Sequence, residues 1–96
     1  MSIEVTTKEP IAKPDPSLVL SILKEGDSYG YELMQKVKER TKGEINFYDV
    51  SIYLVLKPLC NDRMIKGYWA VKNIQRPRRY YTILKKGIQH LERINL

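Results

Sequence analysis

The sequence has a single cysteine and a single histidine, and each scarcity excludes a class of protein. Cys60 has no partner for an internal disulfide, which indicates a reducing compartment such as the cytoplasm. Cys–His catalysis would require Cys60 and His90 to meet in space, and these two ligands alone cannot fill a tetrahedral metal site. Gly26 and Gly30 lack the Lys-Ser/Thr sequel of a phosphate-binding loop. We therefore expect neither an enzyme nor a bound metal or cofactor.

Long apolar runs are also lacking. No stretch approaches the roughly 20 residues that cross a bilayer, which argues against a membrane partner. The opening residues, MSIEVTTKEPIAKPDP, contain no apolar signal-peptide core. Their mixed Thr, Lys, Glu and Pro content predicts a flexible arm over residues 1–14, followed by one small domain over residues 15–96. A domain of this size is only marginally stable alone, so it would gain from a partner subunit.

Negative charge is scarce in the last third of the chain. The formal net charge is +6 over 96 residues. Residues 65–96 contain eight Lys or Arg against one acid, Glu92, whereas the first 64 residues contain nine bases and ten acids. A localised basic excess favours a polyanionic partner, because binding releases counterions from phosphates. A solvated basic surface with no partner is the alternative that charge alone leaves open.

Three helices are predicted in the first two thirds of the chain. Asp15 as N-cap and Pro16 at the first position begin a helix that Gly26 ends. A second helix has Ser28 as its expected cap and ends at Lys42-Gly43. A third is expected to begin at Asp49 as cap. Each has an apolar stripe at helical spacing, formed in turn by residues 18, 19, 22 and 23, by residues 30, 33, 34 and 37, and by residues 52, 55, 56 and 59.

The period then changes from helical to alternating. The segment IKGYWAVK (65–72) alternates as a half-buried strand, with Ile65, Gly67, Trp69 and Val71 on one face. NIQRP forms the turn, and RRYYTI (78–83) returns as a second strand. A last helix is expected over roughly residues 85–94. The fold class is therefore mostly α with a small β-hairpin, in the order ααα-ββ-α, which is the winged helix-turn-helix plan.

This plan assigns candidate DNA-binding residues. The third helix would enter the major groove and present Ser51, Tyr53 and Lys57 on its solvent side. The hairpin, or wing, would place Arg76, Arg78 and Arg79 along phosphates or in an adjacent narrow minor groove.

Each candidate residue also has a purely structural interpretation. The helix residues could form an ordinary exposed face, and Arg78 and Arg79 could stack on neighbouring aromatic rings. That reading of the arginines is weakened because residues 65–91 contain no acid to pair with them. Trp69 and Tyr81 are expected to pack in the core under the wing. Pro58, deep in the third helix, predicts a kink near residue 54 rather than a break.

Three segments together resemble the PadR family of bacterial transcriptional regulators. They are SYGYELMQKVKERT (28–41), SIYLVLKPL (51–59) and RPRRYYTILKKGIQHL (76–91), and the resemblance covers about residues 17–94. It implies a homodimeric winged-helix repressor that binds double-stranded DNA at a near-palindromic operator. It also implies that the six candidate residues contact DNA, and that Tyr29 and Tyr31 anchor the second helix.

The chain departs from the family pattern at several positions. Arg63 replaces a turn glycine, which leaves Asn61 or Asp62 to help the chain turn, and Pro58 stands where a basic residue is common. The last helix is short, so dimerisation would rely on the first helix, the N-terminal arm and about three final turns. Because the family's effector pocket uses a longer last helix, a small-molecule effector is the least supported implication of the resemblance.

Two other functions are compatible with the same residues. The first is a plasmid centromere-binding or architectural DNA-binding protein, which would bind arrays of repeats rather than one operator. The second is a winged-helix protein-interaction module whose hairpin binds an acidic partner; such a module would fail to bind DNA even at low salt.

Overall fold

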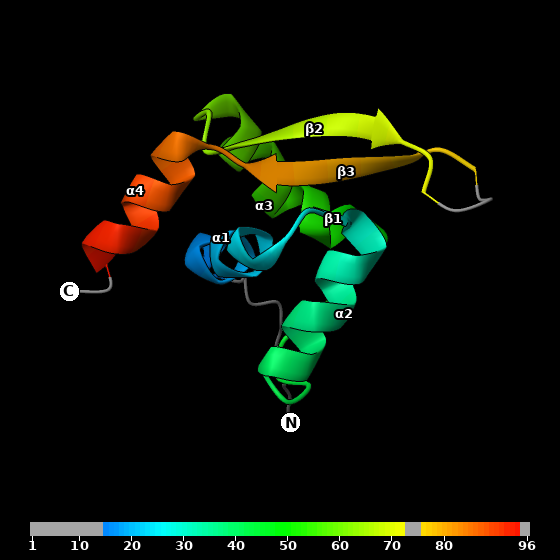
Figure 1. Cartoon of the computed structure of the whole chain (residues 1–96). Coiled ribbons are helices and arrows are strands. Elements are labelled where there is room, and N and C mark those ends of the chain that lie inside the picture. Colours follow the sequence, from blue (N-terminus) through cyan, green and yellow to red (C-terminus); the bar gives the residue numbers. More distant parts are fainter. Residues whose placement is uncertain (1–14, 73–75, 95–96) are drawn as a thin grey trace, which may run out of the picture.

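The computed structural model describes residues 15–72 and 76–94 of the chain. Its elements are α1 (Pro16–Glu25), β1 (Ser28–Tyr29), α2 (Gly30–Arg40), α3 (Asp49–Asn61), β2 (Ile65–Ala70), β3 (Arg78–Ile83) and α4 (Lys85–Ile94). Figure 1 shows the β2–β3 hairpin extending beyond the helices, with α1 beneath the sheet and α4 at the opposite end from the hairpin tip. The predicted order ααα-ββ-α is confirmed, with one short strand added.

The helix ends follow the predicted chemistry in α1 and differ from it in α2 and α3. Asp15 Oδ1 accepts a hydrogen bond from the Ser17 backbone N–H at 3.0 Å, so the predicted cap of α1 is confirmed. Ser28, the expected cap of α2, is instead fully buried in β1, where its Oγ accepts from Lys36 Nζ at 3.2 Å. Tyr29 is the N-cap of α2.

The third helix begins one residue earlier than predicted. Its N-cap is Tyr48, and Asp49 is the first helical residue. The helix continues through Pro58 to Asn61, so the expectation that Pro58 does not break it is confirmed. After Asn61 the chain reverses at Arg63, whose φ of 60° lies in the left-handed region. Asp62, the C-cap residue of α3, forms this turn together with Arg63, so the expectation that Asn61 or Asp62 would help the chain turn is confirmed for Asp62, while Arg63 takes the left-handed conformation.

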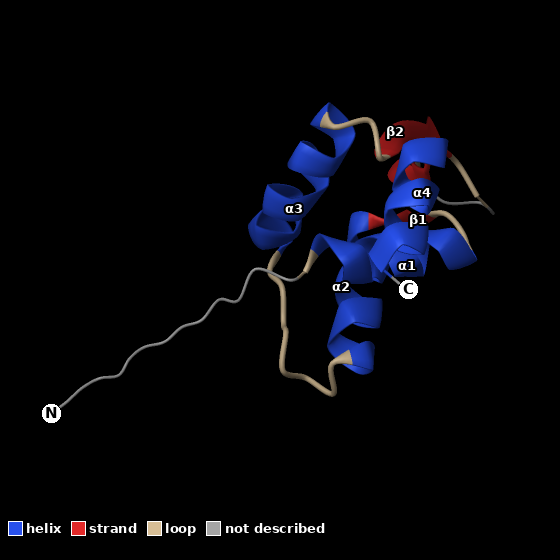
Figure 2. Ribbon diagram, turned by 90° about the vertical axis from the view of Figure 1, so that its left-hand side faces the viewer, coloured by secondary structure: helices blue, strands red, loops and turns tan. Residues whose placement is uncertain are grey.

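The core is formed by the predicted stripes. Leu33, Met34 and Val37 of α2 and the predicted apolar face of α3 are buried, while α1 buries Val19, Leu20, Ile22 and Leu23. Leu20 lies outside the predicted stripe. It is buried because α1 is the central helix and contacts α2, α4 and β3. Figure 2, turned by 90° from Figure 1, shows α3 standing apart on one side, with α1, α4 and the sheet on the other.

The hairpin belongs to a three-stranded antiparallel sheet in the order β1-β3-β2. Ser28 pairs with Tyr81 and Tyr29 with Tyr80, so the residues just before α2 are hydrogen-bonded to the wing. In the β2–β3 pair, Gly67 lies opposite Tyr81 and Trp69 opposite Arg79. The predicted return strand over residues 78–83 is confirmed, and of the predicted turn NIQRP, residues 73–75 lie outside the described part of the chain.

Trp69 is not a core residue. Its side chain is 66% exposed, and Val71 beyond it is 57% exposed, so the expected burial of Trp69 under the wing is wrong. Tyr81 is buried at 4% exposure, as predicted, and Tyr80 on the other face is buried as well. The core ends near Ile65 and Tyr81, and the outer half of the hairpin projects past it.

The remaining small features agree with a compact helical domain. Gly87 and Leu91 are buried on the inner face of α4, and Cys60 is half-buried against the core. Burial raises the pKa of the Cys60 thiol, and the charge of Arg79 opposes part of that shift. None of the helices in residues 15–72 and 76–94 has the length and apolar character needed to cross a membrane.

Candidate nucleic-acid interface

The exposed side of α3 carries the residues predicted to face a DNA groove. Tyr53 is 48% exposed, Lys57 is exposed and Ser51, near the start of the helix, is half-buried. Tyr53 and Lys57 lie away from the stripe that faces the core, which includes Ile52 and Leu56, whereas Ser51 lies on the other flank of the helix, one turn before Val55. The helical spacing of the buried residues therefore fixes which side chains α3 presents to solvent.

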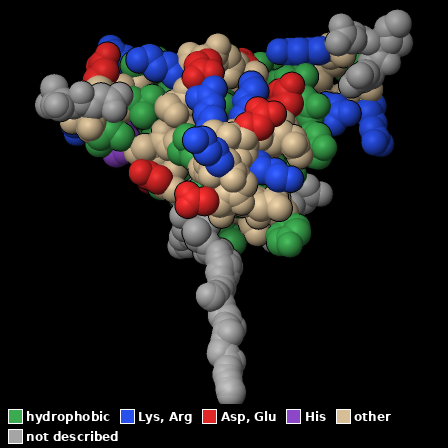
Figure 3. Space-filling model, turned by 90° about the horizontal axis from the view of Figure 1, so that it is seen from below, with side chains coloured by type: hydrophobic (Ala, Val, Ile, Leu, Met, Phe, Trp, Pro, Cys, Tyr) green, Lys and Arg blue, Asp and Glu red, His purple; other side chains and the backbone are tan. Residues whose placement is uncertain are grey.

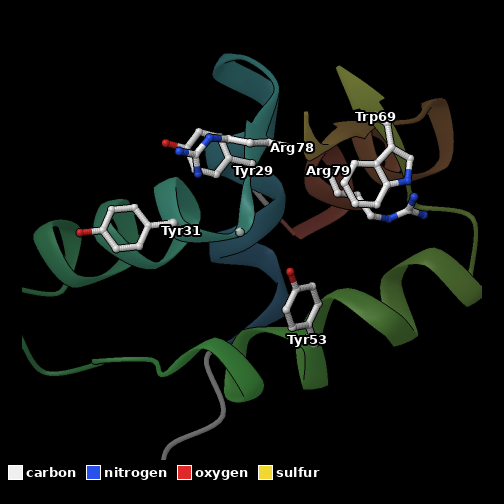
Figure 4. Close-up of a pocket in the computed structure, with 7 residues that line it drawn as sticks. Tyr29, Tyr31, Tyr53, Trp69, Arg78 and Arg79 are labelled. Carbon is white, nitrogen blue, oxygen red and sulfur yellow. The ribbon is translucent and has the colours of Figure 1, made fainter. Parts of the chain in front are cut away.

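Tyr53 does not extend freely into solvent. Its hydroxyl lies 3.4 Å from the position that a Cβ on Gly30 would occupy, so the ring leans from α3 onto the first turn of α2. Figure 4 shows the Tyr53 ring pointing away from its own helix, between Tyr29 and Arg78 on one side and Trp69 and Arg79 on the other. A Cβ at Gly30 would itself be in ordinary van der Waals contact with Tyr53, so the two helices meet closely at this point.

The wing arginines lie on aromatic rings. The Arg78 guanidinium carbon is 4.6 Å from the centroid of the Tyr29 ring, and that of Arg79 is 5.9 Å from the centroids of both Trp69 and Tyr81. The structural interpretation of these residues, stacking on neighbouring rings, is therefore correct in its geometry. Contact with a ring does not neutralise an arginine, because an aromatic quadrupole attracts a cation without cancelling its charge.

Neither arginine meets a carboxylate. Within residues 15–72 and 76–94 the ion pair that forms joins Arg40 to Glu25, on α2 and α1, with Arg40 Nη1 donating to Glu25 Oε2 at 2.8 Å. The Arg78 Nε atom is shielded from solvent and has no hydrogen-bond partner among the described residues. Arg76, two residues before β3, is exposed. Arg76 and Arg79 are therefore exposed cations of the wing, and Arg78 is a half-buried one.

Arg79 can lie against β2 because Gly67 has no side chain. A Cβ built on Gly67 would lie 2.7 Å from Arg79 Nη2 and 2.8 Å from its Cζ and Nε, so the guanidinium rests directly on the backbone of β2. The sequence singled out Arg79 but gave no indication of this contact, because it depends on the strand register that places Gly67 beside the arginine.

Two adjacent hollows connect the helix residues with the wing. The first, about 300 Å³, is lined by Gly30, Tyr53, Arg78 and Arg79 together with Tyr29, Tyr31 and Trp69. The second, about 380 Å³, is lined by Tyr53, Lys57, Arg79 and three neighbours. Tyr53 and Arg79 border both hollows. Of the six predicted residues, these two line both hollows, Arg78 and Lys57 line one each, and Ser51 and Arg76 line neither.

The tyrosines of this surface differ in their surroundings. Tyr29 and Tyr31 were expected to anchor α2: Tyr29 is half-buried, with its ring 5.4 Å from that of Tyr80, but Tyr31 is 57% exposed. Tyr68, at the outer edge of the hairpin, donates its hydroxyl to Asp27, and this hydrogen bond raises its pKa to about 12. Burial raises the pKa of Tyr81, with a smaller contribution from Tyr53.

Charge is unevenly distributed around this surface. Figure 3, seen from below the view of Figure 1, shows acidic and basic side chains intermixed over the centre of that face, and basic side chains next to the wing tip at the upper right. The described residues contain no cluster of three or more His, Cys, Asp or Glu that could hold a metal ion. The arrangement can therefore bind an extended anion, and it offers exposed aromatic and hydroxyl groups beside the cations.

Comparisons with known proteins agree with this geometry. The family model described as the transcriptional regulator PadR-like family matches residues 19–93. A PadR family transcription regulator from Clostridium difficile R20291 is similar to this chain, with 32% identity, a TM-score of 0.74, and coverage of 83% of this chain and 81% of that one. A PadR-like transcriptional regulator from Bacillus cereus is 28% identical, with a TM-score of 0.75 and coverage of 83% and 76%.

Two further similarities are more limited. Bacillus subtilis PadR, solved in complex with operator DNA, has a TM-score of 0.71 at 22% identity, covering 84% of this chain and 46% of that one, and supports the fold alone. An uncharacterised protein from Lysinibacillus sphaericus is 28% identical over 78 residues, which span 81% of this chain and 72% of that one. The family match extends from α1 to α4 and so includes both the helices and the wing. This chain belongs to the transcriptional regulator PadR-like family.

Proposed function

We propose that this protein is a cytoplasmic homodimeric repressor that binds double-stranded DNA sequence-specifically, with α3 in the major groove and the wing on the phosphates. The observation that carries the proposal is the shared surface of Tyr53, Lys57 and Arg79, where exposed helix residues and unpaired wing cations border the same hollows. Membership of the PadR-like family and the similarity in fold to an operator-bound relative support it.

The two elements would have different tasks. Lys57 and Tyr53 project from the exposed side of a helix, and the half-buried Ser51 lies near its start, so these residues would reach base edges and specify sequence. Arg76, Arg78 and Arg79 lie on the wing, where contact with phosphates positions the protein without reading bases. We propose that Tyr31, exposed beside Arg78 in the first hollow, adds a phosphate contact at the start of α2.

A dimer would present two such surfaces to a near-palindromic site. We propose that α1, the arm over residues 1–14 and α4 form the interface, in a domain that comprises residues 15–96. Ile94 is 50% exposed on the last turn of α4, and Ile88 on the same helix is only half-buried. These side chains would lose contact with water if two α4 helices packed together, which would offset the marginal stability of so small a domain.

Selection of bound sites from random DNA, paired with a mass measurement of the complex, tests the proposal. We expect one enriched, near-palindromic sequence bound by two protomers, with an affinity that falls steeply as salt rises. Enrichment of tandem repeats would favour the centromere-binding alternative. Absence of DNA binding at low salt would contradict the proposal and favour a protein-interaction module.

Variants separate the two tasks. Arg78→Ala should weaken binding to all sequences alike and reduce the salt slope by about one, whereas Lys57→Ala or Tyr53→Ala should change the selected sequence. Lys86→Ala is the matched control for charge, because Lys86 is exposed at the start of α4, before the Ile88 and Ile94 side chains proposed for the interface and at the opposite end of the sheet from the wing tip (Figure 1). If Arg78→Ala affected binding no more than Lys86→Ala, the wing assignment would be wrong.

A further inference from the structure

A third cavity lies on a different part of the molecule, between α1, α3 and α4. Its volume is about 460 Å³, within the range of small-molecule sites in proteins. It shares no residue with the two hollows at the wing. Its apolar lining comes from Pro16 at the start of α1 and from α3 and the turn that follows, namely Leu54, Val55, Pro58, Leu59 and Met64.

Leu54 and Pro58 are unusual residues for the outside of a helix. Both are exposed, and Leu54 is 63% exposed, on the part of α3 that borders this cavity. They stand one helical turn apart and so form a continuous apolar edge. Exposed apolar side chains that border a concave surface indicate contact with a ligand more strongly than scattered ones do.

The polar groups at the cavity are mostly acidic. Asp15 and Asp62 line it together with His90, and the described lining residues include no lysine or arginine. This is notable in a chain whose net charge is +6. An apolar pocket that is lined by two carboxylates favours a ligand with an apolar body and a positive charge.

The two carboxylates are not equivalent. Asp15 Oδ1 already accepts the Ser17 N–H as the N-cap of α1, where the positive end of the helix dipole offsets its charge. Asp62 is the C-cap residue of α3 and is exposed, so its charge adds to the negative end of that helix dipole. Asp62 is therefore the stronger attractor for a cation.

We propose that this cavity is a binding site for a small organic cation, an ammonium group carried on an apolar body. The apolar body would lie against Leu54, Pro58 and Met64, and the ammonium group would lie nearest to Asp62. The binding itself does not depend on the proposed DNA function. Because the same helix presents Tyr53 and Lys57, a ligand here would bias the placement of α3, and that consequence does rest on the proposed function.

Three probes of matched shape test the site in the full-length protein without DNA. They are 3-phenylpropylammonium, 3-phenylpropanol and 3-phenylpropanoate, which share the apolar body and carry positive, zero and negative charge. Binding is followed by NMR shifts of the Leu54, Val55 and Met64 methyl groups. We expect the ammonium to bind with a Kd on the order of 1 mM, roughly fivefold more tightly than the alcohol, and the carboxylate to bind least.

Isosteric variants test which carboxylate is responsible for the preference for the ammonium probe. Asp62→Asn should remove most of the preference for the ammonium over the alcohol. Asp15→Asn should remove less of it and should leave α1 intact, because Asn is also a good N-cap. Glu39→Gln, at an exposed acid on α2, makes the same change in net charge away from the cavity and should preserve the preference.

Several results would overturn the proposal. Equal binding of the three probes would show an apolar surface without charge selection, and shifts confined to Trp69 and the aromatic rings near the wing would place cation binding there instead. Contacts from residues 1–14 or from a second copy to Leu54 in the ligand-free protein would show that the chain itself fills the cavity. If DNA binding failed but the ammonium still bound selectively, this inference would stand without the proposed function.

Discussion

Replacing Gly67 with alanine should weaken DNA binding while leaving the fold intact. The added Cβ would lie 2.7 to 2.8 Å from three atoms of the Arg79 guanidinium, which is closer than van der Waals contact permits. Those atoms are the far end of a flexible side chain, so Arg79 can move away at little cost. The variant therefore displaces one cation from the wing without removing it from the protein.

The effects on stability and on binding should differ in size. Alanine in place of glycine in a strand favours the folded state by roughly 0.5–1 kcal/mol. The displaced arginine loses its contacts with Trp69 and Tyr81, a loss of about 0.5–1 kcal/mol at an exposed site. These terms offset each other, so the free energy of unfolding should change little. Loss of a charge-assisted bond to phosphate costs about 1.5–3 kcal/mol, which is on the order of 10- to 100-fold in Kd.

Fluorescence anisotropy with a labelled operator, repeated over a range of salt concentrations, measures both effects on binding. The Gly67→Ala variant should bind more weakly, with a salt slope smaller by about 0.9. Arg79→Ala should show the same loss, and the double variant should be no weaker than Arg79→Ala alone. If Gly67→Ala bound with the affinity and salt slope of the wild type, the placement of Arg79 on β2 would have no part in binding.

Three further predictions concern local structure. Arg63→Gly should stabilise the fold by about 0.5–1 kcal/mol in denaturant titrations, because relief of the left-handed conformation exceeds the entropy that glycine adds to the unfolded chain; an unchanged or lower midpoint would contradict this. Gly87→Ala should destabilise by about 1–3 kcal/mol and lower the melting temperature, since its Cβ would lie 2.5 Å from the Met64 carbonyl oxygen; an unaltered melting temperature would show that the backbone there can move. Asp27→Asn should bring the Tyr68 pKa down from about 12 toward 10 in an absorbance titration. Because the raised pKa favours the neutral phenol, its contribution to stability is present below pH 10 and is lost as the pH rises to about 12, and a variant with an unchanged titration curve would exclude Asp27 as the cause.

The helices and the hairpin were predictable because each has a sequence period of its own. The stripes of α2 and α3 assign Leu33, Val37, Ile52 and Leu56 to the core from spacing alone, and each of them is buried. The residues of α3 that lie outside the buried stripe must face solvent. For this reason Tyr53 and Lys57 could be proposed as DNA-binding residues from the sequence.

Features that depend on distant pairing could not be predicted. β1 has only two residues, too few to show alternation, and it is a strand because Ser28 and Tyr29 pair with residues more than fifty positions away. The local signal at Ser28 was that of a helix cap, and burial against β3 overrode it.

Trp69 shows a different limit of sequence patterns. Alternation correctly places Trp69 on the same face of β2 as Ile65, but it does not say how far along the strand the core extends. Ile65 is fully buried, whereas Trp69, four residues further on, has passed the edge of the core. The same limit applies to Gly67, whose contact with Arg79 depends on the register between two strands.

The pairing of β1 with β3 also has a mechanical consequence. Because β3 is the central strand, a force applied to the wing tip is transmitted through Tyr80 and Tyr81 to Tyr29, the residue on which α2 begins. The wing cannot swing as a free hairpin without breaking these backbone hydrogen bonds. Bending of the wing and tilting of α2 are therefore coupled, and the paired amides at this junction should be protected from exchange with solvent.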